Sequence, residues 1–158
     1  MFSPELTSVI RGFQTEPRVP IAALAERLGL SVWTSALPRG ISGKLTKDPT
    51  HGGKSGFAIF VNESEPVHRR RFTVAHEVGH FLLHRHLLDE GAIVDDAFYR
   101  SRLSNRLEAE ANRAAAEILM PWHLINKETA VGVVETDQLA DKFGVSETAM
   151  KIRLGIPT

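Results

Sequence analysis

The sequence predicts an α+β fold in which a small three-stranded sheet packs on a long helix and a C-terminal pair of short helices forms a helix-turn-helix-like lobe. Apolar residues recur at helical spacing before residue 30 and after residue 66, whereas short β-branched and aromatic runs lie between them. The helices therefore flank the strands instead of alternating with them, which is typical of an α+β chain.

Two short helices are predicted at the N-terminus. Ser3 followed by Pro4 is typical of an N-cap and first turn, and this helix is expected to end near Gly12. Pro20 begins the second helix, whose sequence IAALAERL has apolar residues at helical spacing, and Gly29 ends it.

Three strands are predicted between Leu30 and Val61. The segments SVWTSA, GISGKLT and GFAIFV are short and separated by turns that contain Pro and Gly. They are expected to form one small sheet.

Two longer helices follow the predicted strands. Pro66 introduces a helix that extends to about His86, and Ser104 starts another that Pro121 terminates. A short helical turn comes next.

The last residues have the spacing of a helix-turn-helix. Thr136 is predicted to cap QLADKF, Gly144 to end that helix, and Ser146 to cap ETAMKIRL. We therefore expect one main domain over residues 1–130 and a helical tail over residues 131–158 that packs on it.

Composition excludes several classes of function. The chain has 158 residues, with 19 basic and 19 acidic side chains and no cysteine. Zero net charge argues against binding of nucleic acid by bulk charge, and the absence of cysteine excludes disulfides, thiolate metal sites and thiol catalysis. No membrane-spanning stretch or signal peptide is visible, so the expected location is the cytoplasm.

A polar stripe runs along the helix that contains RRRFTVAHEVGHFLLHRH. Thr73, His76, Glu77, His80 and His84 share one flank of this helix, and apolar residues fill the rest of its circumference. A solvated helix face normally carries Lys, Arg and Glu, so this stripe indicates a functional site.

The stripe contains the pattern H-E-x-x-H at His76, Glu77 and His80. Two histidines at i and i+4 direct their imidazoles to one side, where both can reach a single Zn²⁺ ion. Glu77 lies beside them as a candidate catalytic base that accepts a proton from water. His84 lies about 12 Å along the axis from His76, so it is expected to contact substrate or to orient a ligand.

The third metal ligand is open between two candidates. His86 has the spacing of the third histidine in metzincins, but Leu83 occupies the position at which that motif needs glycine. The other candidate is a carboxylate on the helix SNRLEAEANRAAAEIL.

Among the carboxylates of that helix, Glu108 is favoured. Glu110 and Glu117 share a flank with Arg106 and Arg113 and are predicted to form solvated ion pairs with them. Glu108 has no cation on its flank, and Asn112, one turn later, is expected to orient a ligand.

The two motifs RFTVAHEVGHFLLH and EAEANRAAAEILMP together resemble the ImmA/IrrE family of metallopeptidases, and the likeness covers most of the chain. Ala114 departs from the family pattern, which usually has Phe there. The resemblance implies a gluzincin-like, zincin-type fold with Zn²⁺ on His76, His80 and Glu108, Glu77 as general base, and Mn²⁺ as a possible substitute. It also implies that the substrate is a helix-turn-helix repressor of a stress-response, mobile-element or toxin–antitoxin system.

Two other functions remain open. One is a module that holds a partner protein without cutting it, and the other is a regulator that binds DNA through the C-terminal helices. The expected recognition helix has only Lys151 and Arg153 as cations, so direct DNA binding is disfavoured. Tyr99, His84 and His123 are candidates to polarise the scissile carbonyl, and oligomeric state is not predicted.

Overall fold

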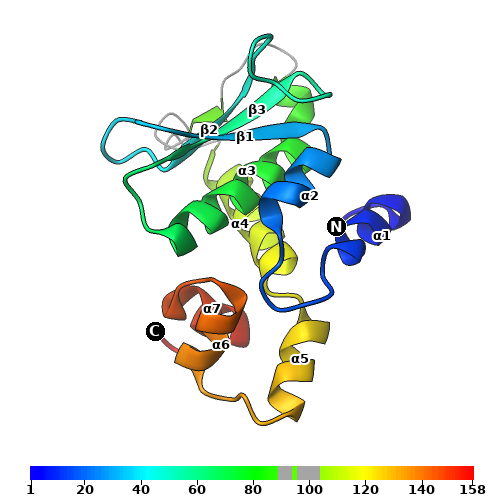
Figure 1. Ribbon diagram of the computed structural model, residues 1–158, viewed down its shortest axis with the longest axis vertical. Coiled ribbons are helices and arrows are strands. Elements are labelled where there is room, and N and C mark those ends of the chain that lie inside the picture. The colour runs from blue at the N-terminus through cyan, green and yellow to red at the C-terminus, as the bar shows by residue number, and fades with distance from the viewer. Residues whose placement is uncertain (89–93, 96–103) are drawn as a thin grey trace.

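The computed structural model describes residues 1–88, 94–95 and 104–158, and it confirms the α+β fold (Figure 1). The sheet has the strand order β1-β3-β2-β4, formed by β1 (Leu30–Ser35), β3 (Phe57–Asn62), β2 (Gly43–Lys47) and β4 (Val94–Asp95). β1 runs parallel to β3, whereas β2 is antiparallel to β3 and β4. The first three strands are those predicted, and the two-residue β4 extends the sheet beyond them.

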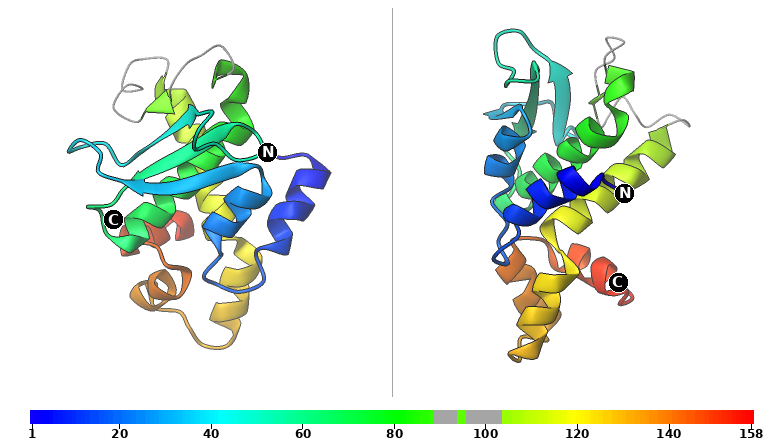
Figure 2. Two further views of the ribbon diagram at one scale, coloured as in Figure 1. Left: turned by 45° about the horizontal axis from the view of Figure 1, so that its top comes forward. Right: turned by 90° about the vertical axis from the view of Figure 1, so that its right-hand side faces the viewer.

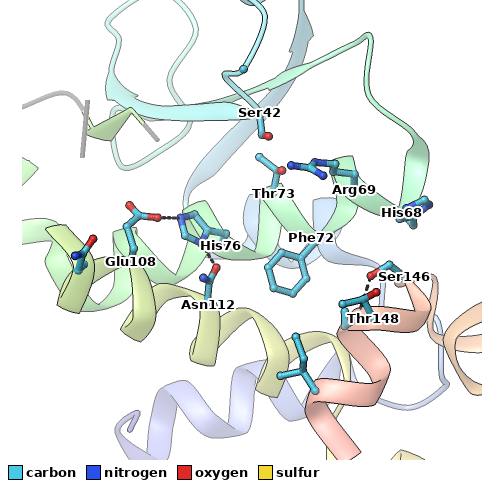
Figure 3. A pocket seen from close by; sticks show the side chains of 14 residues that line it. Ser42, His68, Arg69, Phe72, Thr73, His76, Glu108, Asn112, Ser146 and Thr148 are labelled. Atoms are coloured by element: carbon cyan, nitrogen blue, oxygen red, sulfur yellow. Dashed lines mark hydrogen bonds and ion pairs between the residues drawn. The ribbon is translucent and has the colours of Figure 1, made fainter. Parts of the chain in front are cut away.

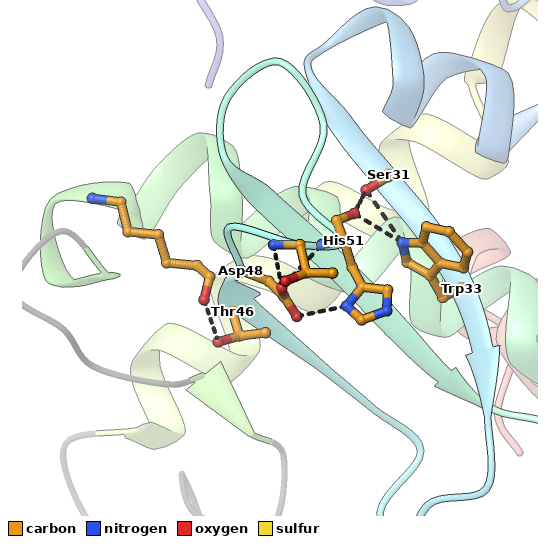
Figure 4. A network of polar contacts seen from close by, with 7 residues as sticks. Ser31, Trp33, Thr46, Asp48 and His51 are labelled. Carbon is orange, nitrogen blue, oxygen red and sulfur yellow. Dashed lines mark hydrogen bonds and ion pairs between the residues drawn. The ribbon is translucent and has the colours of Figure 1, made fainter.

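The loop between β2 and β3 is held by a polar network (Figure 4). The Asp48 carboxylate accepts hydrogen bonds from the backbone N–H groups of Thr50 and His51, both at 2.9 Å. The His51 carbonyl accepts from Trp33 Nε1 at 2.9 Å and from the Ser31 hydroxyl, so the loop is tied to β1. The backbone bond from His51 is the main reason that the pKa of Asp48 is lowered.

The two N-terminal helices are α1 (Pro4–Gly12) and α2 (Ile21–Arg27). The Ser3 hydroxyl accepts from the Leu6 N–H at 3.2 Å, which confirms the predicted N-cap. Gly29 follows α2 with a φ of 98°, a left-handed conformation that glycine adopts without strain and that directs the chain into β1.

The long helix α3 (Val67–Leu88) lies between the sheet and α4 (Ser104–Leu119), as Figure 2 shows. Its sheet-facing side chains pack into the core, where the rings of Phe57 and Phe81 meet edge to face with centroids 5.5 Å apart. Leu45 and Ile59 of the sheet are fully buried in the same core. This packing fixes the opposite flank of α3, with its histidines, towards α4.

A close approach brings α3 against α4 at Gly79. A Cβ atom at this glycine would lie 3.0 Å from the Ala111 carbonyl oxygen and 3.1 Å from the Ala114 Cβ. Ala111 and Ala114 are fully buried. Small residues on both helices therefore set the distance between them, and the small side chain at position 114 fits this contact.

We expect Gly79→Leu to lower the free energy of unfolding by about 1–3 kcal/mol, because a large side chain overfills this packed contact. It should also weaken metal binding, since it moves α4 relative to α3. Urea unfolding of the metal-free protein and Zn²⁺ titration measure the two effects. Unchanged values for both would contradict the close packing described here.

The C-terminal lobe consists of α5 (Trp122–Ala130), α6 (Thr136–Phe143) and α7 (Glu147–Leu154). Gly144 ends α6 with a φ of 66°, and the Ser146 hydroxyl caps α7 by accepting from the Ala149 N–H, both as predicted. The prediction that Thr136 caps α6 was wrong. Glu135 occupies the cap position, and the Thr136 hydroxyl instead donates to the Glu147 carboxylate at 3.1 Å.

Arginine side chains tie this lobe to the rest of the molecule. Arg153 donates to the Met120 carbonyl at 2.9 Å, and Arg18 donates to the Asp141 carbonyl at 2.8 Å. Within the lobe, Arg153 lies 5.2 Å from the ring centroid of Trp122. The division of the chain into domains at residue 130 stays a prediction. Among the described helices, none is long and apolar enough to cross a membrane.

Candidate metal centre

α3 presents three potential metal ligands or bases inside the protein. His76 is 5% exposed, and Glu77 and His80 are fully buried. One ligand atom from each of the three lies within 4.8 Å of the others. The i and i+4 positions of the histidines place both imidazoles on the same side of the helix, as the sequence predicts.

Glu108 of α4 reaches both histidines. Its Oε2 lies 2.9 Å from His76 Nε2, and its Oε1 lies 3.0 Å from His80 Nε2. Burial acts to raise the pKa of Glu108, but hydrogen bonds and charges from the two imidazoles lower it, to about 2. Glu108 is therefore ionised at neutral pH, as a metal ligand must be.

Asn112 orients the first of these histidines. His76 Nδ1 lies 2.8 Å from Asn112 Oδ1, an amide oxygen that only accepts hydrogen bonds, so His76 Nδ1 carries the proton and donates it. The lone pair of the neutral ring is then on Nε2, directed towards Glu108. Burial lowers the pKa of His80, which favours its neutral form as well.

This donor set fits a divalent cation. When both histidines carry their ring proton on Nδ1, their Nε2 lone pairs converge with the Glu108 oxygens, and a divalent cation can take the place of the proton that an imidazole otherwise donates to the carboxylate. Two imidazole nitrogens and one carboxylate are also the ligands of a common catalytic Zn²⁺ site. Glu77 Oε1 lies 4.0 Å from His76 Nε2, close enough to act on a group held at this point without displacing Glu108.

A cleft leads from this cluster to the C-terminal lobe (Figure 3). The cavity has a volume of about 570 Å³ and reaches from Ser42, His76 and Glu108 past Phe72 to Ser146, Thr148 and Ile152 of α7. A second cavity of about 520 Å³ shares Phe72, Asn112, Ala149 and Ile152 with the first, and its other lining residues are Arg113, Ala116, Met120 and Arg153. The cleft therefore has the candidate metal ligands at one end, and next to α7 it has an apolar patch of Phe72, Met120 and Ile152 bordered by polar side chains.

The remaining residues predicted for the site do not line the cleft or lie outside the described residues. His84 lies against His80, 2.9 Å between their Nδ1 atoms, instead of lining the cleft. His123 bonds to the Gln14 carbonyl, and His86 is exposed on the surface. Tyr99 lies outside the described residues.

The sequence interpretation of Glu110 was wrong. It was expected on a solvated face paired with arginine, but its Oε1 lies 3.0 Å from His84 Nε2. His84, the third histidine of the stripe, is the feature of the sequence that indicates a partner on α4. The direction of the His84 side chain depends on the local backbone, which departs from helical geometry at His84 with φ −124° and ψ 16°. The spacing of residues in the sequence does not reveal this departure.

Comparison with known proteins gives consistent matches. The sequence profile of the IrrE N-terminal-like domain, a peptidase family, matches residues 18–155. The radiation response metalloprotease IrrE of Deinococcus radiodurans is 41% identical over 80 residues, which is 49% of this chain and 22% of that protein. Its namesake in Deinococcus deserti is 33% identical over 105 residues, or 65% of this chain and 31% of that protein.

The solved structure of a Mycobacterium tuberculosis transcriptional regulator has the same fold. It aligns with a TM-score of 0.64 and 18% identity, covering 98% of this chain and 48% of that one. The chain thus spans about half of this structure and a third or less of the two IrrE proteins. Because the family profile covers nearly the whole chain and includes both motif helices, the protein belongs to the peptidase family of IrrE N-terminal-like domains.

Proposed function

We propose that the protein is a zinc-dependent endopeptidase whose substrate is a helix-turn-helix transcriptional repressor. The observation that supports this most is the reach of Glu108 from α4 to both Nε2 atoms of the H-E-x-x-H motif, at 2.9 and 3.0 Å. In this proposal His76, His80 and Glu108 hold the ion and Glu77 is the catalytic base. Mn²⁺ is the alternative ion.

The chemistry that such an ion supplies is Lewis acidity, which polarises a peptide carbonyl and acidifies water. Glu77 takes a proton from the attacking water while the water oxygen forms a bond to the carbonyl carbon. Glu77 then passes that proton to the amine nitrogen, which leaves when the C–N bond breaks. Burial of Glu77 keeps bulk water away from this transfer.

The shape of the cleft supports a polypeptide substrate. Its two adjoining cavities extend from the metal ligands to an apolar wall formed by Phe72, Met120 and Ile152. An extended peptide bound at the histidines has its neighbouring side chains next to this wall. The choice of a repressor as substrate rests on the family resemblance.

The C-terminal helices do not favour the DNA-binding alternative. Lys151 lies 3.4 Å from the Glu147 carboxylate, and Arg153 is bonded to the Met120 carbonyl. Both cations of the expected recognition helix are therefore engaged within the protein. α7 also faces the cleft, where Ala149 and Ile152 line it.

The test incubates the Zn²⁺-loaded protein with the helix-turn-helix repressor encoded nearest to it and follows the repressor by intact-mass spectrometry. Two discrete fragments that a chelator abolishes are the expected result. Parallel reactions with Zn²⁺ and Mn²⁺ restored to metal-free protein identify the active ion. A repressor that stays intact but co-elutes with the protein would instead support a binding module.

We expect Ile152→Asp to lower kcat/KM for the cleaved substrate about tenfold, mainly through KM. Ile152 is 68% exposed in the apolar patch of the cleft, and a carboxylate there loses the burial of an apolar group of the substrate. Ile156→Asp is the control, because Ile156 is also exposed but lines neither cavity. Equal losses in both variants would show that α7 does not contact substrate.

A further inference from the structure

A second carboxylate of α4 connects to the metal cluster through His84. His80 Nδ1 lies 2.9 Å from His84 Nδ1, and His84 Nε2 lies 3.0 Å from Glu110 Oε1. His80 and His84 are 0% and 4% exposed, so both rings meet away from solvent. The contacts connect Glu110 through His84 to Nδ1 of His80, whose other nitrogen, Nε2, faces Glu108.

The chemistry of Glu110 fixes the direction of each hydrogen bond in this chain. A carboxylate is ionised at neutral pH and then only accepts hydrogen bonds. His84 Nε2 must therefore donate to it, and the 2.9 Å contact between the two Nδ1 atoms needs an acceptor, which is His84 Nδ1. His80 Nδ1 then donates to it, and the lone pair of His80 is on Nε2.

The backbone of α3 is adapted to this arrangement. At His84 the helix departs from α geometry, with φ −124° and ψ 16°. A change of this kind alters the direction of the side chain, and here the His84 ring contacts both the preceding histidine and the neighbouring helix.

We propose that His84 and Glu110 act as positioning residues that hold His80 in the tautomer and orientation needed to bind the metal ion. His80 thereby has the same kind of support that Asn112 gives to His76, but through two residues instead of one. In this arrangement α4 supplies two residues to the site. Glu108 is a metal ligand, and Glu110 orients the ligand His80 through His84. This inference rests on the proposed metal site.

The test is the Zn²⁺ dissociation constant, measured on the full chain by competition with a chromophoric chelator. Glu110→Ala removes the acceptor at the end of the chain, and we expect affinity to fall by about 10–100-fold, the usual effect of losing a residue that orients a ligand. Glu110→Gln keeps an acceptor oxygen and should lie between wild type and Glu110→Ala.

Glu117→Ala is the matched control, because Glu117 lies two turns further along the same flank of α4. It should keep wild-type affinity and, with Co²⁺ in place of Zn²⁺, the wild-type visible absorption spectrum. Glu110→Ala should change that spectrum, because the ligand ring is no longer fixed. Circular dichroism of the metal-free proteins checks that each variant folds, since the Glu110 side chain is 33% exposed and its loss leaves no buried cavity.

Wild-type affinity and spectrum in Glu110→Ala would overturn the inference, and so would an equal loss in Glu117→Ala. Failure of the proposed function gives different results from failure of this inference. A wild-type protein that binds Zn²⁺ but cuts nothing contradicts the endopeptidase and leaves the measured affinities to decide the role of Glu110. A wild-type protein that binds no Zn²⁺ contradicts both.

Discussion

Glu77→Gln is expected to bind metal as tightly as wild type and to lose cleavage, with kcat/KM lower by about 10²–10⁴-fold. Glu77 is fully buried, and its Oε1 lies 4.0 Å from His76 Nε2, beside the ligands without replacing one of them. Glutamine has nearly the same shape, so the cluster of His76, His80 and Glu108 is preserved. What is lost is the carboxylate that we propose accepts a proton from water.

The measurement pairs two assays on the same preparations. Zn²⁺ titration establishes that the variant is loaded, and mass spectrometry of the repressor follows product over time. A loaded Glu77→Gln protein that still cuts at the wild-type rate would exclude Glu77 as the base. Binding of intact repressor by the same variant would separate recognition from cleavage.

The part of the site on one helix was predictable from sequence because helical spacing is a local property. His76, Glu77 and His80 lie one turn or less apart, so their shared side of α3 follows from the periodicity alone. Glu108 was favoured by exclusion, since it is the carboxylate of α4 with no cation on its own flank. The structure brings it to both histidines.

The contacts between helices were harder to predict, because they depend on how α3 crosses α4. The pairing of Glu110 with His84 needs the backbone departure at His84 and the close approach at Gly79, and residue spacing encodes neither. The same limit applies to α7. Its sequence has helix-turn-helix spacing, whereas tertiary contacts decide that Ile152 lines the cleft.

The strands show the same difference between local features, which the sequence predicts, and non-local ones. Three of them follow from short β-branched segments bounded by turns, but the parallel pairing of β1 with β3, with β2 on the other side of β3, is a non-local property. A strand of two residues such as β4 has too little pattern to be recognised in a sequence.

Glu108→Ala should have the largest effect on metal binding. It removes a carboxylate that contacts both Nε2 atoms, so the Zn²⁺ affinity should fall by more than the factor of about 10–100 expected for a residue that only orients a ligand. Cleavage should fall to background. Glu117→Ala again serves as the control with wild-type behaviour.

Unfolding experiments provide an independent readout of the same loss. A ligand that binds only the folded state stabilises it by about 2.7 kcal/mol at a concentration of 100 Kd, so Zn²⁺ should raise the unfolding midpoint of wild type and leave that of Glu108→Ala almost unchanged. His86→Ala distinguishes the other candidate for the third ligand. Because His86 is exposed and Glu108 touches both histidines, His86→Ala should retain the full Zn²⁺-induced shift. If His86 were the third ligand, as in the metzincin motif, His86→Ala would lose the Zn²⁺-induced shift and Glu108→Ala would retain it.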